Sequence, residues 1–509
     1  MSGKSILKRN TTKARKGNGY LRFIFQKEQV PDWIVLFLTV ALGCFLVTRT
    51  YPYPMTSGDS FGYLWAALND RFTYLRPFGY SFFLQIVAWF SRSIFSVIVS
   101  NALIYTLSLG LLTLAVKKYW PPRRKWSFLC LEAAAAFSPA AIFMLDTIMS
   151  DTLQTSLVFL MVAMLILMIQ EESWWAMVVY VLALFASFHT RYSALFFPFA
   201  FLPVIALKGR PAFRITTILL TIAAFLVFHE QRTRNMTAQL AQRQFSTGFE
   251  GWQLANNALH VIPFIEMDEK VKVPEDEDVR ELHRFVLRYE LTNKSMIAST
   301  NNGTKATADF IWDYKSPLKQ YLYRNKKGDD YSLNWIMLGS GLYKKYGKWL
   351  ILHYPGRFIR YYLLQNVKEV FFTTKREMIC KHDGGVIPTG KDEVVRWYNV
   401  PPDLDFGTRG NTYDRLFSPL MPWIELVTWL IFAASAVLLL TRKRLSRMPR
   451  ETRLVLLMLF LFGFVYYGSI TFASPIALRY WMPMHAIKLV FAWIAVVSSK
   501  ILEPGHSES

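Results

Sequence analysis

A set of long apolar runs constrains this 509-residue chain more than any other feature. A helix that crosses a bilayer needs about 20 mostly apolar residues, with a range of about 17–25. Runs of about this length, some of them short, occur at 33–49, 94–116, 127–145, 152–170, 174–188, 193–207, 213–229, 421–440, 454–471 and 483–499. Only 18% of the residues are charged, against about 25% in soluble domains. The sequence therefore predicts a polytopic α-helical membrane protein with about 10 transmembrane helices, and it excludes a coiled coil, a disordered chain and a disulfide scaffold.

Basic residues gather between these runs and test the count of ten. They cluster in residues 1–32 and in the loops 117–125, 208–214 and 442–453. Ten crossings put all four clusters on one side of the membrane, which the positive-inside rule makes the cytoplasmic side. We therefore predict that both termini are cytoplasmic. These clusters also account for the net charge of +22, so we predict no nucleic-acid partner.

The topology divides the chain into four parts. They are a basic cytoplasmic arm at 1–32, a transmembrane region with catalytic outer loops at 33–229, an extracytoplasmic domain at 230–420, and a C-terminal transmembrane region at 421–509. The inserted domain precedes the last three helices and is long enough to fold alone. We expect it to be mixed and mainly α-helical, with a helix near 357–372.

The outer face carries the loops 50–93, 146–151, 189–192 and 472–482 together with the inserted domain. Within the first loop, 79–92 is apolar but short, and an eleventh crossing there would reverse the charge pattern. We predict an interfacial helix at this position. Only Cys380 lies in the large polar region, so no disulfide is expected within it. Carboxylates alone are able to bind a divalent cation, but no ligand spacing indicates a metal, and no cofactor is expected to be required.

Three carboxylates in the outer loops are candidates for a polar site. Asp59 follows Gly58 in the first loop, and Asp146 and Asp151 lie in the short turn between the third and fourth runs. Each has a structural explanation, because aspartate readily caps a helix N-terminus. The alternative is a shared site, because two loops bring carboxylates to one depth, where burying a charge costs about 2.5–3.5 kcal/mol.

Arginines and tyrosines lie in the same loops. Arg76 precedes the predicted interfacial helix, Arg191 follows the fifth run and Arg479 precedes the last. Such arginines often only snorkel to the interface, yet a guanidinium also binds phosphate through two parallel hydrogen bonds. The neighbouring tyrosines are either interfacial belt residues or substrate-binding residues: Tyr63, Tyr80 and Tyr480.

In this order and topology, these motifs resemble the GT-C superfamily of integral-membrane glycosyltransferases, which use lipid-phosphate sugars. The motifs are Asp59 with Tyr63, the Arg76-Pro77-x-x-Tyr80 segment, Ser150-Asp151 at the start of a span, and Arg479-Tyr480 before the last one. They are most similar to bacterial members of the protein mannosyltransferase and lipid A aminoarabinose transferase type. The resemblance covers about 30–230 and 420–500, and it implies residence in the bacterial inner (plasma) membrane.

The resemblance also implies roles for these residues. Asp59 would be the catalytic base, and the second acidic position maps to Asp151, with Asp146 as the alternative. Arg479 would bind the donor phosphate, with Arg191 and Arg76 as further candidates. Relatives often carry Ser-Glu where this chain has Ser150-Asp151, so its carboxylate is one methylene shorter. The implied reaction moves a sugar from a polyprenyl-phosphate donor to a lipid, glycan or protein acceptor in the cell envelope, with inversion of the anomeric centre.

The residue chemistry agrees with this activity, and other functions stay open. A polyprenyl phosphate leaves as an anion, so it needs charge stabilisation and no general acid, whereas the acceptor hydroxyl needs a base. A transporter or flippase for lipid-linked substrates is one alternative, although its polar residues should lie near mid-membrane. A lipid-linked glycan ligase or polymerase is a second, and a non-catalytic scaffold is a third.

Overall fold

The computed structural model describes residues 19–56, 58–73, 75–205, 211–240, 249–265, 272–292, 303–325, 334–371, 391–402, 404, 409–410, 412–441 and 444–501. All regular structure among these residues is helical, and extended segments meet only in an isolated bridge between Met55 and Thr147. The predictions for the 1–18 part of the arm, for Cys380 and for the 208–210 part of a basic loop fall outside the described residues.

The predicted polytopic helical membrane protein is confirmed. Among the described residues, seven helices are long and apolar enough to cross a bilayer: α2 (Val30–Thr50), α5 (Ser96–Tyr119), α8 (Ser150–Glu171), α11 (Pro211–Leu240), α23 (Met421–Leu440), α25 (Arg450–Ala473) and α26 (Met482–Ile501). An eighth candidate is a bent pair, α6 (Lys125–Ala136) and α7 (Pro139–Leu145), which meet at 57°. The bend has a local cause, because Ser138 caps α7 and Pro139 occupies its first position.

Two of the ten predicted spans form helices too short to count as candidate membrane spans. The run 174–188 forms α9 (Trp174–Thr190), of 17 residues. The run 193–207 was expected to be a regular helix, but it forms a 3-10 helix, η2 (Tyr192–Phe201), followed by the short α10 (Leu202–Ile205). Pro198 lies inside η2 and lacks the N–H that an α-helix needs. The described part of the chain therefore contains seven or eight candidate spans, and the count of ten remains a prediction.

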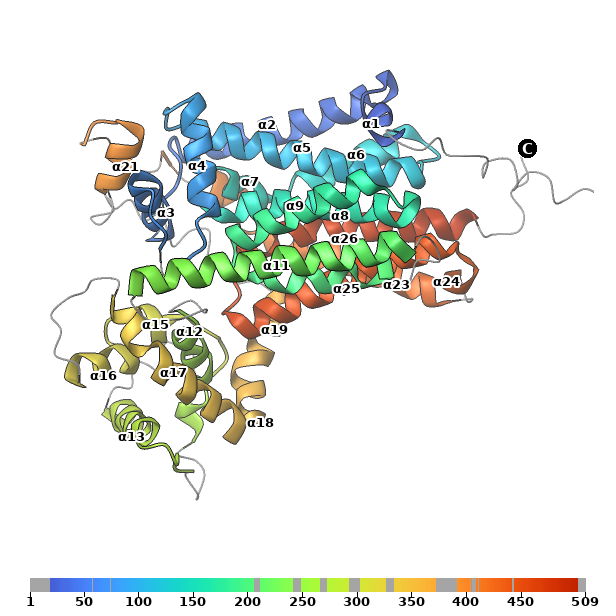
Figure 1. Cartoon of the computed structure of the whole chain (residues 1–509). Coiled ribbons are helices and arrows are strands. Elements are labelled where there is room, and N and C mark those ends of the chain that lie inside the picture. The colour runs from blue at the N-terminus through green and yellow to red at the C-terminus, as the bar shows by residue number, and fades with distance from the viewer. Residues whose placement is uncertain are drawn as a thin grey trace, which may run out of the picture.

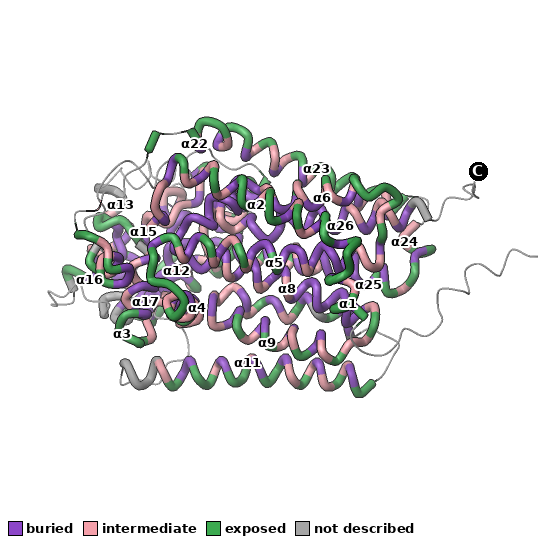
Figure 2. The backbone as a smooth tube through the Cα atoms, turned by 90° about the horizontal axis from the view of Figure 1, so that it is seen from above, coloured by how far each residue is buried: buried purple, intermediate pink, exposed green. Residues whose placement is uncertain are grey.

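The bundle has an inner and an outer layer of helices (Figure 2). In α8 and in the span formed by α26, 83% of the most apolar window is buried inside the protein, against 28% in α2 and α11 and 22% in α23. The outer helices expose large apolar side chains such as Leu38, Leu219 and Leu430. Exposing so large an apolar surface to water would be energetically unfavourable, so this layer faces lipid.

A second group of helices lies at one end of the bundle (Figure 1). It contains α12 (Phe249–Leu259), α13 (Glu277–Thr292), α15 (Asp309–Trp312), α16 (Pro317–Asn325), α17 (Asn334–His353) and α18 (Pro355–Phe358). These helices share a hydrophobic core of their own around Trp252, Tyr343 and Tyr346. The helix predicted near 357–372 is present as α18, a π-helical turn (Ile359–Leu363) and α19 (Leu364–Phe371). The described part of 230–420 contains no strand, so the β content implied by a mixed fold is not found there.

The first outer loop lies at the same end as this group. It forms α3 (Gly58–Asn69) and the predicted short apolar helix, α4 (Gly79–Phe90). α21 (Lys391–Tyr398) packs on α3, with Trp397 and Tyr398 in one apolar cluster with Tyr63 and Tyr80. α1 (Gly19–Ile24) and α24 (Arg444–Arg447) lie at the opposite end of the bundle (Figure 1).

Candidate functional site

A cavity of about 250 Å³ opens where the bundle meets the helical group around Trp252. Its volume approaches the roughly 300–1,000 Å³ of ligand pockets for drug-sized molecules. The described lining residues are Tyr63, Arg76, Pro77, Asp151, Gln154, Thr155, Thr190, Arg191, Tyr192, Ser193, Gln253, Tyr466, Ile470, Ala473, Ser474, Arg479 and Tyr480. The cavity therefore contains all three of the predicted phosphate-binding arginines.

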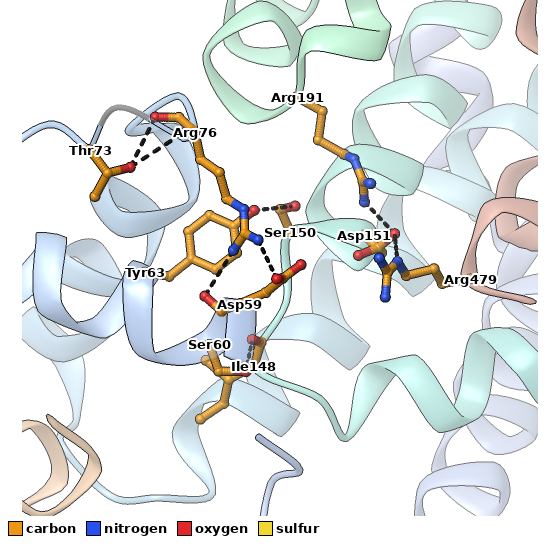
Figure 3. Close-up of polar contacts among 10 residues, drawn as sticks. All are labelled: Asp59, Ser60, Tyr63, Thr73, Arg76, Ile148, Ser150, Asp151, Arg191 and Arg479. Carbon is orange, nitrogen blue, oxygen red and sulfur yellow. Dashed lines mark hydrogen bonds and ion pairs between the residues drawn. The ribbon is translucent and has the colours of Figure 1, made fainter. Parts of the chain in front are cut away.

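Asp59 and Arg76 form an ion pair beside this cavity (Figure 3). Asp59 lies in the first turn of α3, and its carboxylate accepts a hydrogen bond from Arg76 Nη2. Arg76 Nη1 also donates to the backbone carbonyl of Asp59 over 3.1 Å. Asp59 therefore does more than cap a helix, although Arg76, and not Asp59, is the member of this pair that lines the cavity.

The ionisation of Asp59 reflects these neighbours. Burial acts to raise the pKa of its carboxyl, but the positive charges of Arg76, Arg479 and Arg191 outweigh burial and leave the pKa below its ordinary value. Asp59 is consequently ionised at neutral pH. Its side chain keeps 28% of its surface exposed.

Asp151 joins the other two arginines. It lies in the first turn of α8 and only 3% of its side chain is exposed. Its Oδ1 accepts a hydrogen bond from Arg191 Nη1 and lies 3.7 Å from Arg479 Nε. Its Oδ2 is buried with no hydrogen-bond partner among the described residues. One carboxylate thus holds two guanidinium groups side by side (Figure 3).

Two of the three predicted tyrosines take part in this arrangement. Tyr63 donates a hydrogen bond to Ser150 Oγ over 2.9 Å, and Arg76 lies over its ring at 5.1 Å. The Tyr480 ring lies beneath the guanidinium groups of Arg191 and Arg479, at 5.5 and 5.3 Å. Such contacts orient a guanidinium while leaving its N–H groups available.

Tyr80 and Asp146 lie apart from the cavity. Tyr80 is fully buried and contacts Tyr63 edge to face, with ring centroids 4.8 Å apart. Asp146 ends α7 and is fully buried, and neither of its carboxylate oxygens has a hydrogen-bond partner among the described residues. Burial raises the pKa of Asp146 well above its ordinary value. Neither residue lines the cavity.

Two contacts explain why loops distant in sequence meet here. Met55 and Thr147 form the isolated parallel bridge, which ties the first outer loop to the turn between α7 and α8. Ser60 Oγ donates to the backbone carbonyl of Ile148 over 2.8 Å. These bonds bring Asp59 to the turn that precedes Asp151.

Sequence reasoning missed several cavity residues. Gln154 and Thr155 follow Asp151 at the i+3 and i+4 positions that share a helix face, so helical spacing could have indicated them. Gln253 comes from α12, and no sequence signal connects it to the outer loops. The sequence analysis also missed a buried charge cluster, in which Lys488 Nζ lies 2.6 Å and His485 Nδ1 3.4 Å from the carboxylate of Glu425.

Neither a metal-ligand cluster among the described residues nor a similar known protein indicates the chemistry of the site. Among the described residues, no three His, Cys, Asp or Glu side chains gather as metal ligands would. No family model, curated protein or solved structure matches the chain. The chemistry of the site therefore has to be argued from its own residues. Three arginines and one aspartate line the cavity, and this set favours an anion with room beside it for a neutral polar group.

Proposed function

We propose that this chain is an integral-membrane glycosyltransferase that moves a sugar from a polyprenyl-phosphate donor to an acceptor hydroxyl on the extracytoplasmic face. The observation that carries the proposal is the convergence of Arg76, Arg191 and Arg479 on one cavity at the end of a membrane bundle. A lipid phosphate suits this position, because its hydrocarbon chain stays in the bilayer while its phosphate emerges at the surface.

The charge of the cavity supports cleavage of the donor as well as its binding. The described lining residues carry three positive charges and one negative charge, and the ionised Asp59 that pairs with Arg76 beside the cavity reduces the local net charge from +2 to +1. A sugar phosphodiester carries about one negative charge, whereas the phosphate monoester that leaves carries about 1.5–2. The arginines therefore interact more strongly with the leaving group than with the donor, which is the condition for stabilising a transition state.

The proposed reaction is a single displacement at the anomeric carbon. The acceptor oxygen forms a bond to this carbon as its proton passes to Asp59, and the bond to the phosphate oxygen breaks with the electron pair leaving on the phosphate. The ionised carboxylate of Asp59 is suited to accept that proton. Asp151 would position Arg191 and Arg479, which it contacts directly, and its buried Oδ2 makes it the alternative base.

The arrangement of the bundle supports the orientation in this proposal. The helical group around Trp252 lies at one end of the bundle and the basic helix α24 lies at the other (Figure 1), and the cavity is at the end of that helical group because Gln253 of α12 lines it. The positive-inside rule makes the end with α24 cytoplasmic. The active site would then lie on the periplasmic side of a bacterial inner membrane, and the helical group around Trp252 would lie near the acceptor.

One observation favours a second candidate, a transporter of lipid-linked substrates. Glu425, His485 and Lys488 are almost fully buried between α23 and α26, and ionisable residues inside a membrane often mark a transport pathway. Glu425 lies roughly 6 Å from the start of α23 at 1.5 Å per residue, whereas Lys488 is near the middle of the span Leu478–Ser499. Transporter sites typically lie near the midplane, so this cluster keeps the transporter as the second candidate.

Release of free polyprenyl phosphate by protein in nanodiscs tests the proposal. A panel of radiolabelled polyprenyl-phosphate sugars and candidate acceptors would be supplied, and Arg479→Met compared with Arg415→Met, which changes an exposed arginine outside the cavity. We expect release by the wild-type chain, a loss of about 10²–10³-fold in Arg479→Met, and no loss in the control. Movement of the donor across liposomes without cleavage would instead establish the transporter.

A further inference from the structure

The helical group around Trp252 reaches the cavity at a single described residue. Gln253 on α12 is the one described lining residue from 230–420, and all others come from the transmembrane regions and the first outer loop. Its neighbours in the cavity include the three arginines already described. Gln253 is therefore the point at which the inserted region is able to contact a ligand held by those arginines.

A buried amide fixes α12 on the end of a membrane helix. Asn257 is 1% exposed, and its Nδ2 donates to the backbone carbonyls of Phe472 and Ala473 at the end of α25, over 2.8 and 3.1 Å. Ala473 itself lines the cavity. The position of α12, and with it that of Gln253, is thus tied directly to the cavity wall.

The same hydrogen bonds determine the orientation of the side-chain amide of Gln253. Because both partners of Asn257 Nδ2 are carbonyl oxygens, that atom must be the amide nitrogen, and Asn257 Oδ1 must face donors. Its donors are Asn256 Nδ2 and Gln253 Nε2, each at 3.1 Å. One N–H of Gln253 Nε2 is therefore held by Asn257, and the carbonyl oxygen Oε1 is available to accept a hydrogen bond from a ligand hydroxyl.

We propose that Gln253 is a specificity-determining residue that reads one hydroxyl group of the transferred sugar through its Oε1. This inference rests on the proposed function, because the arginines that share the cavity would hold the phosphate next to that sugar. A neutral amide suits an uncharged, hydroxyl-bearing sugar. An ammonium-bearing sugar would instead enter a cavity with a local net charge of +1, in which Asp151 is already paired with two arginines and the adjacent Asp59 with the third.

Donor analogues that lack one hydroxyl at a time test the inference. The probes are polyprenyl-phosphate esters of glucose, mannose and galactose with their single-deoxy analogues, and both binding affinity and polyprenyl-phosphate release are measured. Wild type, Gln253→Leu and Gln253→Met are compared with Gln320→Leu, which changes a glutamine of the same helical group outside the cavity. Thermal unfolding establishes that each variant folds, and the Met variant replaces the Leu variant if the latter does not.

We expect wild type and Gln320→Leu to bind one deoxy analogue roughly five- to tenfold more weakly than its parent, and Gln253→Leu to bind the two equally. An equal loss for every donor in Gln253→Leu, or no change at all, would overturn the inference. So would an altered KM for the acceptor alone, which would mean that Gln253 reads the acceptor. Position-specific binding without any release would leave this inference standing while the transferase proposal failed, and an absence of binding to every probe would end both.

Discussion

Replacement of Asp59 by asparagine separates a catalytic role from a structural one. The substitution keeps the size of the side chain and removes the negative charge that Arg76 contacts. It also removes the ability to accept a proton from an acceptor hydroxyl. The two consequences differ in size, so stability and turnover measured on one sample distinguish them.

The expected loss of stability is small. Asp59 and Arg76 keep 28% and 21% of their side chains exposed, so solvent screens their attraction. Exposed ion pairs contribute about 0–1 kcal/mol, and breaking a buried pair costs about 3–5 kcal/mol. A pair of intermediate exposure should contribute about 1–2 kcal/mol, which in a chain of this size lowers Tm by about 2–4 °C or less.

The expected loss of turnover is much larger. A general base typically contributes about 10²–10⁴ in rate, which corresponds to about 3–5 kcal/mol of transition-state stabilisation. The assay is the release of labelled polyprenyl phosphate by protein in nanodiscs, followed together with thermal unfolding and donor binding. We expect Asp59→Asn to bind the donor and remain folded while its turnover falls by at least a hundredfold.

The matched control is Asp70→Asn, which changes an exposed aspartate just beyond the end of α3. It should leave turnover unchanged. Turnover by Asp59→Asn within threefold of wild type, with Tm retained, would refute the assignment and move the base to Asp151. A parallel fall in turnover and Tm would show that Asp59 acts through folding alone.

Three further predictions concern Arg76, the buried pair of Glu425 and Lys488, and the contact between α12 and α17 at Gly251. Arg76→Met removes the nearest charge that lowers the pKa of Asp59; that pKa should rise, so the acidic limb of the pH–turnover profile should move up by about one to two pH units. Glu425→Gln leaves the buried Lys488 without its carboxylate and should destabilise the protein by about 3–5 kcal/mol in thermal unfolding, whereas adding Lys488→Met should recover most of the loss. Gly251→Ala would place a Cβ 1.9 Å from a backbone carbonyl oxygen of α17, so it should separate α12 from α17 and lower Tm by several degrees.

Each of these predictions has an outcome that contradicts it. An unchanged acidic limb in Arg76→Met would mean that another group controls it. A double variant at Glu425 and Lys488 that is no more stable than Glu425→Gln would mean that the pair is not the cause. The control for Gly251→Ala is Gly341→Ala on α17, where an added Cβ meets nothing within 4 Å; equal effects at both glycines would exclude the packing explanation.

The sequence alone determined the membrane character of the chain, and it predicted that loop residues distant in sequence share a site. Apolar runs have to be buried in lipid or protein whatever their neighbours are, so their length predicts helices without knowledge of packing. The interfacial segment 79–92 and the helix near 357–372 were predicted on the same local ground, and both form helices. Topology then placed Asp59, Asp151 and the arginines on one face.

Tertiary structure decided the pairing of these groups. Asp59 contacts Arg76, 17 residues away, whereas Asp151 contacts Arg191, 40 residues away. Helical and strand periodicity reach only a few residues along the chain, so neither pairing has a sequence signature.

Packing also decided which residues are excluded from the cavity and which reach it. Asp146 precedes Asp151 in the same loop but is fully buried, and its backbone carbonyl accepts a hydrogen bond from the backbone N–H of Met55. Gln253 belongs to a separate helical group. Local sequence fixes where a helix begins and how deep it lies, because burial and backbone hydrogen bonding act on each segment separately. Which side chains then share a cavity depends on contacts between segments, and these exist only once the helices have packed.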